Sequence, residues 1–254
     1  MSDASGVSER DALRTALRRA DGVIFDFDGP VCRLFPQGTA PQTAAIKAAV
    51  WGDTDRLPPP LAKVTDTHDL LKELRGASSD VVRRVTDMVT KFETEAVGSA
   101  SATPHIGALV AHLVAADKNL AIASNNAREP ILEFLGEHGM RAAFGTAVCG
   151  RDPLDISKMK PAPDTLLDAA QKLGLPASRC LLVGDKASDF QAAQAACMTF
   201  VGCTEDREEL KQMTTQGARL VFTSLEPVLA AVTSDDFSTP SVPTPSRTTT
   251  PSSS

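Results

Sequence analysis

The sequence predicts an α/β protein with a doubly wound parallel sheet, a Rossmann-like core, into which an all-helical cap domain is inserted. Two observations lead to this prediction. After Pro104, short apolar runs of strand length alternate with amphipathic helical segments, a pattern typical of a parallel sheet. Between residues 35 and 101 the apolar spacing is helical throughout, and this stretch is too long for an ordinary connection between two strands.

Composition limits the classes of function. The chain has 254 residues, 42% of them hydrophobic, and a net charge of −6. It has neither an apolar run near the roughly 20 residues that span a bilayer nor a signal-like apolar start, and no basic block that would suit a nucleic acid. We therefore expect no membrane partner, no nucleic-acid partner and a cytoplasmic location. The five cysteines form no C-x-x-C pair and are expected to be reduced residues without a metal or disulfide role.

The first predicted core element is a buried strand that ends in two carboxylates. A short helix over residues 10–20, with Leu13 and Leu17 on one face, leads into the apolar run 23–25, which stops at Asp26 and Asp28. Because side chains alternate along a strand, these two acids share one face. Two such close anions require either a hard cation or a proton between them. Taken alone, however, D-x-D-G fits a turn at the end of a strand equally well.

The helical insertion is expected to form three helices, over residues 43–51, 67–75 and 80–96, with the proline run 58–60 between the first two. The resulting domain prediction is an N-terminal segment and helix over 1–20, a core formed by 21–34 and 102–232, a cap over 35–101, and a tail over 233–254. The tail is rich in Ser, Thr and Pro and is expected to be disordered.

The second part of the core alternates helices with strands. Helices are predicted over 106–116, 130–138, 163–173, 187–196 and about 205–213, and strands over 120–123, 146–149, 180–183, 199–201 and 219–222. Since the carboxyl ends of parallel strands meet at one edge, polar residues that follow these strands are expected to lie together there.

Ser124 and Asn125 follow the strand over 120–123, and Pro130 is placed to begin the next helix. Free backbone N–H groups at such a helix start bind anions, although a Ser-Asn pair is also an ordinary N-cap. Further along, Pro161 and Pro163 stiffen the loop that presents Lys160, with Lys158 as a rival for the same role.

The last acidic pair is Asp185, at the end of the strand over 180–183, and Asp189, one helical turn later. Residues four apart in a helix face the same side, and these carboxylates are ligands of the kind that Mg²⁺ prefers. Acidic residues at a helix start are also common because of the helix dipole.

Together, D-x-D at 26–28, Ser124, Lys160 in K-P-x-P, and G-D-x-x-x-D at 184–189 resemble the signatures of the haloacid dehalogenase-like hydrolase superfamily. The helical insertion after the first signature is similar to the branch that contains phosphoglycolate phosphatase-like enzymes. The resemblance covers residues 23–222 and implies a Mg²⁺-dependent phosphatase that hydrolyses a small phosphomonoester, phosphoglycolate-like or sugar-phosphate-like, through an aspartyl-phosphate. The implied roles are catalytic for Asp26, Asp28 and Lys160, substrate-binding for Ser124, Asn125 and Lys160, and metal-binding for Asp26, Asp28, Asp185 and Asp189.

Two alternatives remain open at this stage: a phosphomutase or phosphotransferase of the same superfamily, and a catalytically weak member that binds a phosphorylated ligand. The expected partner is a small phosphorylated metabolite, and the expected assembly is a monomer or a homodimer. A carboxylate at Asp28 favours phosphoryl transfer over dehalogenation, which does not need it.

Two positions depart from the family pattern. Pro30 replaces the usual Thr or Val, and Lys186 stands beside a metal acid where a small residue is usual; we expect the Lys186 side chain to point away from the site. Substrate selection is expected in the cap, for which the sequence offers only weak candidates. These are Arg33, Lys47, Trp51, Lys63, His68 and Lys72.

Overall fold

The computed structural model describes residues 3–52, 57–234 and 237. Its centre is a six-stranded sheet in the order β5-β4-β1-β6-β7-β8, in which all neighbouring strands are parallel. The strands are β1 Gly22–Phe25, β4 Asn119–Ala123, β5 Val148–Cys149, β6 Cys180–Gly184, β7 Thr199–Cys203 and β8 Val221–Phe222. The predicted α/β fold class with a parallel sheet is confirmed.

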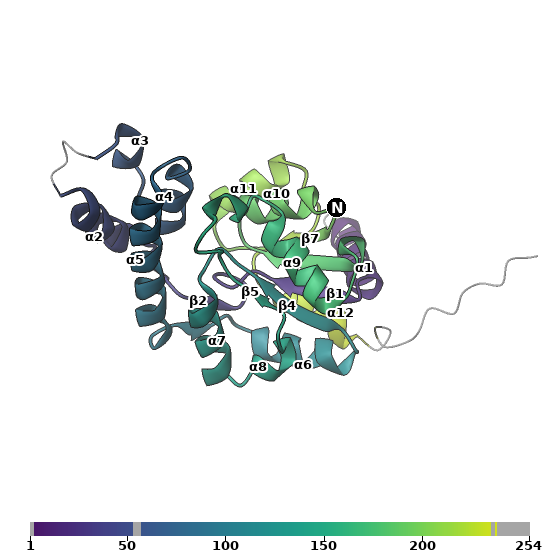
Figure 1. The fold of residues 1–254 in the computed structure, drawn as a ribbon. Coiled ribbons are helices and arrows are strands. Elements are labelled where there is room, and N and C mark those ends of the chain that lie inside the picture. The colour runs from purple at the N-terminus through teal and green to yellow at the C-terminus, as the bar shows by residue number, and fades with distance from the viewer. Residues whose placement is uncertain (1–2, 53–56, 235–236, 238–254) are drawn as a thin grey trace, which may run out of the picture.

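Helices cover both faces of this sheet (Figure 1). One face packs against α1 Asp3–Arg19, α6 Ile106–Ala115, α7 Arg128–Glu137, α8 Arg141–Phe144 and α12 Glu226–Thr233. The other packs against α9 Asp164–Leu173, α10 Ala187–Ala195 and α11 Arg207–Thr215. Strand β1 is apolar on both sides because helices cover both faces of the sheet, as expected of a doubly wound sheet.

Four helices form a separate unit beside the sheet, which we call the helical unit (Figure 1). They are α2 Ala40–Trp51, α3 Pro59–Ala62, α4 Thr67–Glu73 and α5 Ser79–Val97. Their apolar faces meet in a small core of their own around Ile46, Leu70 and Val85. A two-stranded antiparallel sheet, β2 Cys32–Arg33 and β3 Ser101–Ala102, brings together the two chain segments that lead into and out of this unit.

Some local elements differ from the sequence prediction. Two prolines of the 58–60 run start helix α3 rather than only separating its neighbours, because proline is well tolerated in a first helical turn. Helices α8 and α12 and the β2–β3 pair were not predicted, and each is short. Within the predicted tail, Phe237 is buried against the core, and Lys118 lies 5.7 Å from its ring centroid. Residues 235–236 and 238–254 of that tail lie outside the described residues.

None of the helices in the described part of the chain is both long enough and apolar enough to cross a membrane.

Candidate active site

The candidate site lies at the carboxyl edge of the sheet, where the chain order reverses. Strand β1 pairs with β4 on one side and with β6 on the other, with Phe25 opposite both Ile122 and Val183. Chain segments that leave these three strands therefore emerge side by side. Ligands of open α/β sheets bind at such a point. The residues that follow the strands are Asp26 after β1, Ser124 after β4 and Asp185 after β6.

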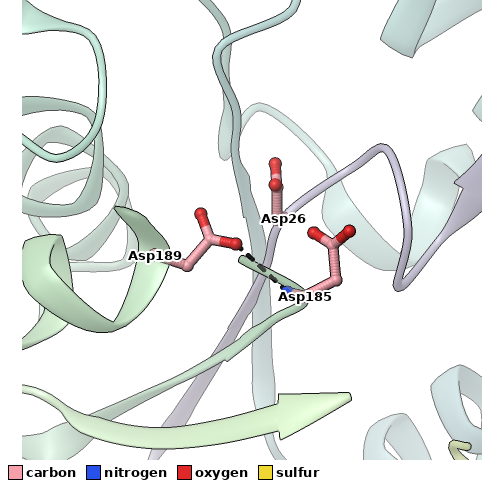
Figure 2. A group of neighbouring side chains, drawn as sticks. All are labelled: Asp26, Asp185 and Asp189. Carbon is pink, nitrogen blue, oxygen red and sulfur yellow. Dashed lines mark hydrogen bonds between the residues drawn. The ribbon is translucent and has the colours of Figure 1, made fainter. Parts of the chain in front are cut away.

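Three carboxylates converge at this point. One oxygen from each of Asp26, Asp185 and Asp189 lies within 4.8 Å of the other two, and Figure 2 shows the side chains grouped around a common space. Asp189 is held by its own helix start, since its Oδ2 accepts from the backbone N–H groups of Asp185 at 3.1 Å and Lys186 at 3.0 Å. The sequence prediction that these three acids lie together agrees with this geometry.

Lys160 lies buried between two of these acids. Its Nζ is 2.9 Å from Asp26 Oδ1 and 2.6 Å from Asp189 Oδ1, and it also donates to the carbonyl of Ala123 at 3.1 Å. Burial by itself would lower the pKa of Lys160, but the Asp189 and Asp26 carboxylates raise it above its ordinary value. One ammonium group therefore serves two carboxylates, and its three N–H donors are all used.

The charge of the cluster is not balanced by this lysine. Burial, together with the Asp189 and Asp26 charges, raises the pKa of Asp185 well above its ordinary value. Burial also raises the pKa of Asp189, although Lys160 acts in the opposite direction. The buried Oδ1 of Asp185 has no hydrogen-bond partner among the described residues. An all-oxygen donor set with an unsatisfied buried oxygen fits a hard divalent cation.

The backbone at Gly29 makes this arrangement possible. Gly29 has a φ of +109°, and any side-chain carbon at that position would overlap the Asp185 carboxyl group. Only glycine tolerates both the positive φ and the close approach. The D-x-D-G sequence is therefore required at two levels, for its acids and for the space beside them.

Asp28 borders the same cavity, although its carboxylate is not one of the three clustered acids. Its Oδ1 accepts from the backbone N–H of Leu34 at 2.9 Å. Burial raises the pKa of Asp28, and the Asp26 charge adds to the effect. A carboxyl group with a raised pKa is suited to donate a proton near neutral pH.

Ser124 and Asn125 lie beside Lys160. The Asn125 amide fastens the lysine loop, because its Oδ1 accepts from Lys160 N at 2.8 Å and its Nδ2 donates to Lys160 O at 3.2 Å. Ser124 Oγ donates to Asn126 Oδ1 at 3.0 Å and accepts from Asn126 N at 3.3 Å. The stiffening of the lysine loop was expected from its prolines alone, but this amide bridge contributes as well.

The expected direction of Lys186 is wrong. Its side chain borders the cavity together with Asp28 and Asp185. Burial alone would lower the pKa of Lys186, but the carboxylates of Asp185, Asp66 and Asp28 raise it above its ordinary value. The excess of negative charge at this edge attracts the ammonium group inward, which sequence spacing does not reveal. Lys158, the rival of Lys160, instead pairs with Asp152 at 3.0 Å on the surface.

Three of the six weak candidates for substrate selection border cavities that the site acids also line. His68 and Lys72 border a cavity of about 560 Å³ that also contains Asp26, Asp28 and Lys160. Arg33 borders a neighbouring cavity and pairs with Glu205. The other three have different surroundings: Lys47 donates to the carbonyls of Ala62 and Val64, Trp51 packs in the helical unit, and Lys63 is exposed.

A second buried polar cluster was not predicted. Glu93 of α5 pairs with Arg151, which follows β5, and both side chains are 1% exposed. The signal was present in the sequence: Glu93 stands in a series spaced by four with Val85, Val89 and Val97, all on the buried face of α5. A charge on an apolar stripe predicts a buried partner, but it does not say which one.

Comparison with known proteins agrees with this geometry. The sequence model of the haloacid dehalogenase-like hydrolases matches residues 63–203, which is more than half of the chain and includes Ser124, Lys160, Asp185 and Asp189. The chain belongs to the haloacid dehalogenase-like hydrolase family. Asp26 and Asp28 precede the matched region, so their assignment rests on the site geometry and on the D-x-D-G sequence.

Curated relatives of this family member include phosphoglycolate phosphatases of Escherichia coli (strain K12) and Salmonella typhi. Each is 35% identical over 104 residues, which cover 40% of this chain and 39% of the relative. The match thus spans about two fifths of the length of these curated relatives.

Solved structures show the same fold over most of the chain. A putative phosphoglycolate phosphatase from Lactobacillus plantarum superposes with a TM-score of 0.62 at 20% identity, over 84% of this chain and 99% of that one. CbbY from Rhodobacter sphaeroides, solved in complex with phosphate, superposes with a TM-score of 0.59 at 19% identity, over 84% and 99% of the two chains.

Proposed function

We propose that this protein is a Mg²⁺-dependent phosphatase that hydrolyses a small phosphomonoester of the phosphoglycolate type. The observation that carries the proposal is the cluster of Asp26, Asp185 and Asp189, with Lys160 between two of them and Asp28 beside them, at the edge where open α/β sheets bind their ligands. The names of the curated relatives support the choice of phosphoglycolate as the first substrate to test.

Asp26 would act as the nucleophile. Its Oδ1 accepts hydrogen bonds from Lys160 Nζ at 2.9 Å and from Phe27 N at 2.7 Å, and no described residue donates to its Oδ2. Oδ2 would attack phosphorus, forming an O–P bond as the ester P–O bond breaks, to give an aspartyl-phosphate. The lysine fixes the carboxylate so that Oδ2 faces the incoming ester.

Asp28 would act as the proton carrier. It would donate its proton to the leaving ester oxygen in the first step and take a proton from water in the second. That water would attack phosphorus, break the bond to Asp26 and release inorganic phosphate. Phosphoryl oxygens would accept from the Ser124 hydroxyl, which would turn away from Asn126 Oδ1, and from the Asn125 backbone N–H. The described residues provide no acceptor for that N–H.

Asp26, Asp185 and Asp189, with the backbone carbonyl of Asp28, would hold Mg²⁺. The bound ion would neutralise the negative charge that the phosphate group adds to these acids. The helical unit would act as a cap over residues 35–101, and the core would comprise 21–34 and 102–232. A cytoplasmic location and a monomeric or homodimeric state remain predictions.

The test is phosphate release from phosphoglycolate and p-nitrophenyl phosphate with and without Mg²⁺. Activity that depends on Mg²⁺ and is lost on chelation supports the proposal. Absence of phosphate release from every ester, with the Mg²⁺ site shown to be filled, contradicts it. Product analysis for an isomerised phosphate separates hydrolysis from the phosphomutase alternative.

One observation favours the second candidate, a catalytically weak member that binds a phosphorylated ligand. Lys186 faces Asp185 and competes electrostatically with a divalent ion. Thermal unfolding with and without about 10 mM Mg²⁺ distinguishes the two candidate functions, because a ligand that binds only the folded state raises Tm. An unchanged Tm in the wild type and a raised Tm in Lys186→Met would favour the weak member.

A further inference from the structure

The cluster around Glu93 joins the helical unit to the core. Arg151 Nη1 and Nη2 lie 3.0 and 3.2 Å from the two Glu93 oxygens. Glu93 also accepts from Ala127 N at 2.9 Å and from Asn126 Nδ2 at 3.2 Å. Arg151, Asn126 and Ala127 all belong to the core, so one carboxylate of α5 receives four hydrogen bonds across the boundary. This anchoring is complete without any further donor.

A fifth hydrogen bond comes from the helical unit itself. His68, at the start of α4, lies with its Nε2 3.1 Å from Glu93 Oε1, and its side chain is 14% exposed. Because an ionised carboxylate only accepts, Nε2 must carry the proton. Glu93 therefore selects the tautomer and the orientation of the His68 ring.

His68 is also one of the residues that line the proposed catalytic cavity. His68 borders it together with Asp26, Asp28 and Lys160. In the ranges that the structure describes, no group hydrogen-bonds to His68 Nδ1. A neutral ring offers a lone pair at Nδ1 to a hydroxyl group, and a protonated ring offers an N–H to an anion. A nitrogen with this freedom at the edge of a polar cavity is suited to contact a ligand.

The remaining lining of the cavity restricts the kind of ligand. The described residues that line it are mainly polar and include no aromatic side chain other than His68. The polar residues that line the cavity include Asp69, Lys72, Gln191, Thr204 and Gln212. Such a surface offers hydrogen bonds to an oxygen-rich group and little apolar contact for a nucleobase or a phenyl ring.

We propose that His68 contacts, through Nδ1, a hydroxyl or carboxylate oxygen next to the phosphate ester of the substrate, and that Glu93 is the positioning residue that holds the ring for this contact. The proposal rests on the proposed phosphatase function for the nature of the ligand. It adds a selecting group from the helical unit and links that group to the anchoring of the unit on the core.

The test measures binding rather than turnover, in an Asp26→Asn background. The probes are phosphoglycolate, glycerol phosphate and inorganic phosphate. The binding affinity of each is measured by calorimetry in the presence of Mg²⁺. His68→Ala is expected to weaken phosphoglycolate binding about 10-fold, the effect of one lost hydrogen bond to a charged group, and inorganic phosphate binding less than about 2-fold. The glycerol phosphate result shows whether a hydroxyl is recognised as well as a carboxylate. His112→Ala, an exposed histidine on α6, is the matched control.

Two isosteric variants separate contact from structure. Asparagine places its amide near the position of Nδ1, whereas glutamine places its amide near Nε2. If His68 contacts the ligand, His68→Asn restores more of the phosphoglycolate affinity than His68→Gln. The opposite order, or an affinity of His68→Ala within 2-fold of the parent, overturns the proposal.

Glu93→Gln tests the positioning role. It is expected to weaken phosphoglycolate binding to a similar extent as His68→Ala, and the double variant is expected to show no further loss, because the two residues act as a unit. Fully additive losses overturn the role of Glu93. If Glu93→Gln does not fold, the asparagine and glutamine variants of His68 still decide the contact. If the protein with an intact Asp26 releases no phosphate, the proposed phosphatase function is contradicted. The binding constants can still be measured and still test the role of His68.

Discussion

Two buried groups of charges in this protein have carboxyl pKa values shifted in opposite directions. At the sheet edge, Asp26 and Asp189 share Lys160, and Asp185 lies beside them without this partner. Burial raises the pKa values of Asp185 and Asp189. At the boundary between the helical unit and the core, burial acts on Glu93 in the same sense, but Arg151 and His68 lower the pKa of Glu93 to about 2. The boundary cluster is balanced by its own partners. The sheet-edge cluster is left with an excess of negative charge, which is typical of a site that acts on a ligand.

The largest expected effect tests the unbalanced cluster. Asp26→Asn removes the proposed nucleophile and should lower kcat for phosphate release by at least about 10⁴-fold, as loss of a nucleophile does in other hydrolases. Steady-state kinetics on phosphoglycolate measures it, with Asp80→Asn on the exposed face of α5 as the control. Turnover retained in Asp26→Asn would contradict the role of Asp26 as the nucleophile.

The next effect tests the balanced cluster. Arg151→Leu leaves the Glu93 carboxylate buried without its main partner and should lower the free energy of unfolding by about 3–5 kcal/mol. Arg83→Leu breaks a surface pair with Asp80, in which the side chains are 65% and 84% exposed, and should cost less than about 1 kcal/mol. Urea denaturation of both variants gives the two values. Equal losses would show that the Glu93 cluster is no more important than a surface pair.

A pH series sharpens the contrast between raised and lowered pKa values. The pKa of Glu93 falls from 4.5 to about 2 on folding, so its contribution is complete above about pH 5 and is lost as the pH falls toward 2. This contribution is about 3 kcal/mol by linkage. The free energy of unfolding of the wild type should therefore decrease over that range more steeply than that of Glu93→Gln. If the free energies of unfolding of wild type and Glu93→Gln show the same pH dependence, the lowered pKa of Glu93 is contradicted.

The smallest effect has the opposite sign. Because the pKa of Asp185 is raised on folding, its ionisation opposes folding, and this cost grows as the pH rises above the ordinary pKa of an aspartate. Asp185→Asn should therefore raise the Tm of the metal-free protein at pH 7 by about 2–4 °C, or about 1 kcal/mol. The same variant should lose the Tm increase that Mg²⁺ produces in the wild type. A lower Tm in the metal-free variant would show that Asp185 is a structural residue.

The sequence was informative wherever the relevant forces are local. Apolar runs of strand length, such as 120–123, and helices with one apolar face, such as 163–173, were placed correctly within a few residues. The convergence of Asp26, Asp185 and Asp189 followed from one rule, that parallel strands end at the same edge. Short elements were missed because α8 and β2 contain too few residues to show a period.

The direction of Lys186 and the partners of Glu93 required the tertiary structure. Lys186 extends from a loop whose sequence allows either direction, and the field of Asp185, Asp66 and Asp28 decides between them. Glu93 and Arg151 are 58 residues apart, and their pairing depends on how the helical unit lies against the core. No local spacing specifies that relation.

By itself the amino-acid sequence determined the α/β alternation, the helical character of the insertion and the acids at the strand ends, because backbone preference and apolar periodicity act over a few neighbouring residues. Only the tertiary structure decided which charges are balanced. Electrostatic energy depends on distances in space, so residues that are far apart in the chain decide the balance. Glu93 finds such partners, whereas Asp185 Oδ1 has none among the described residues.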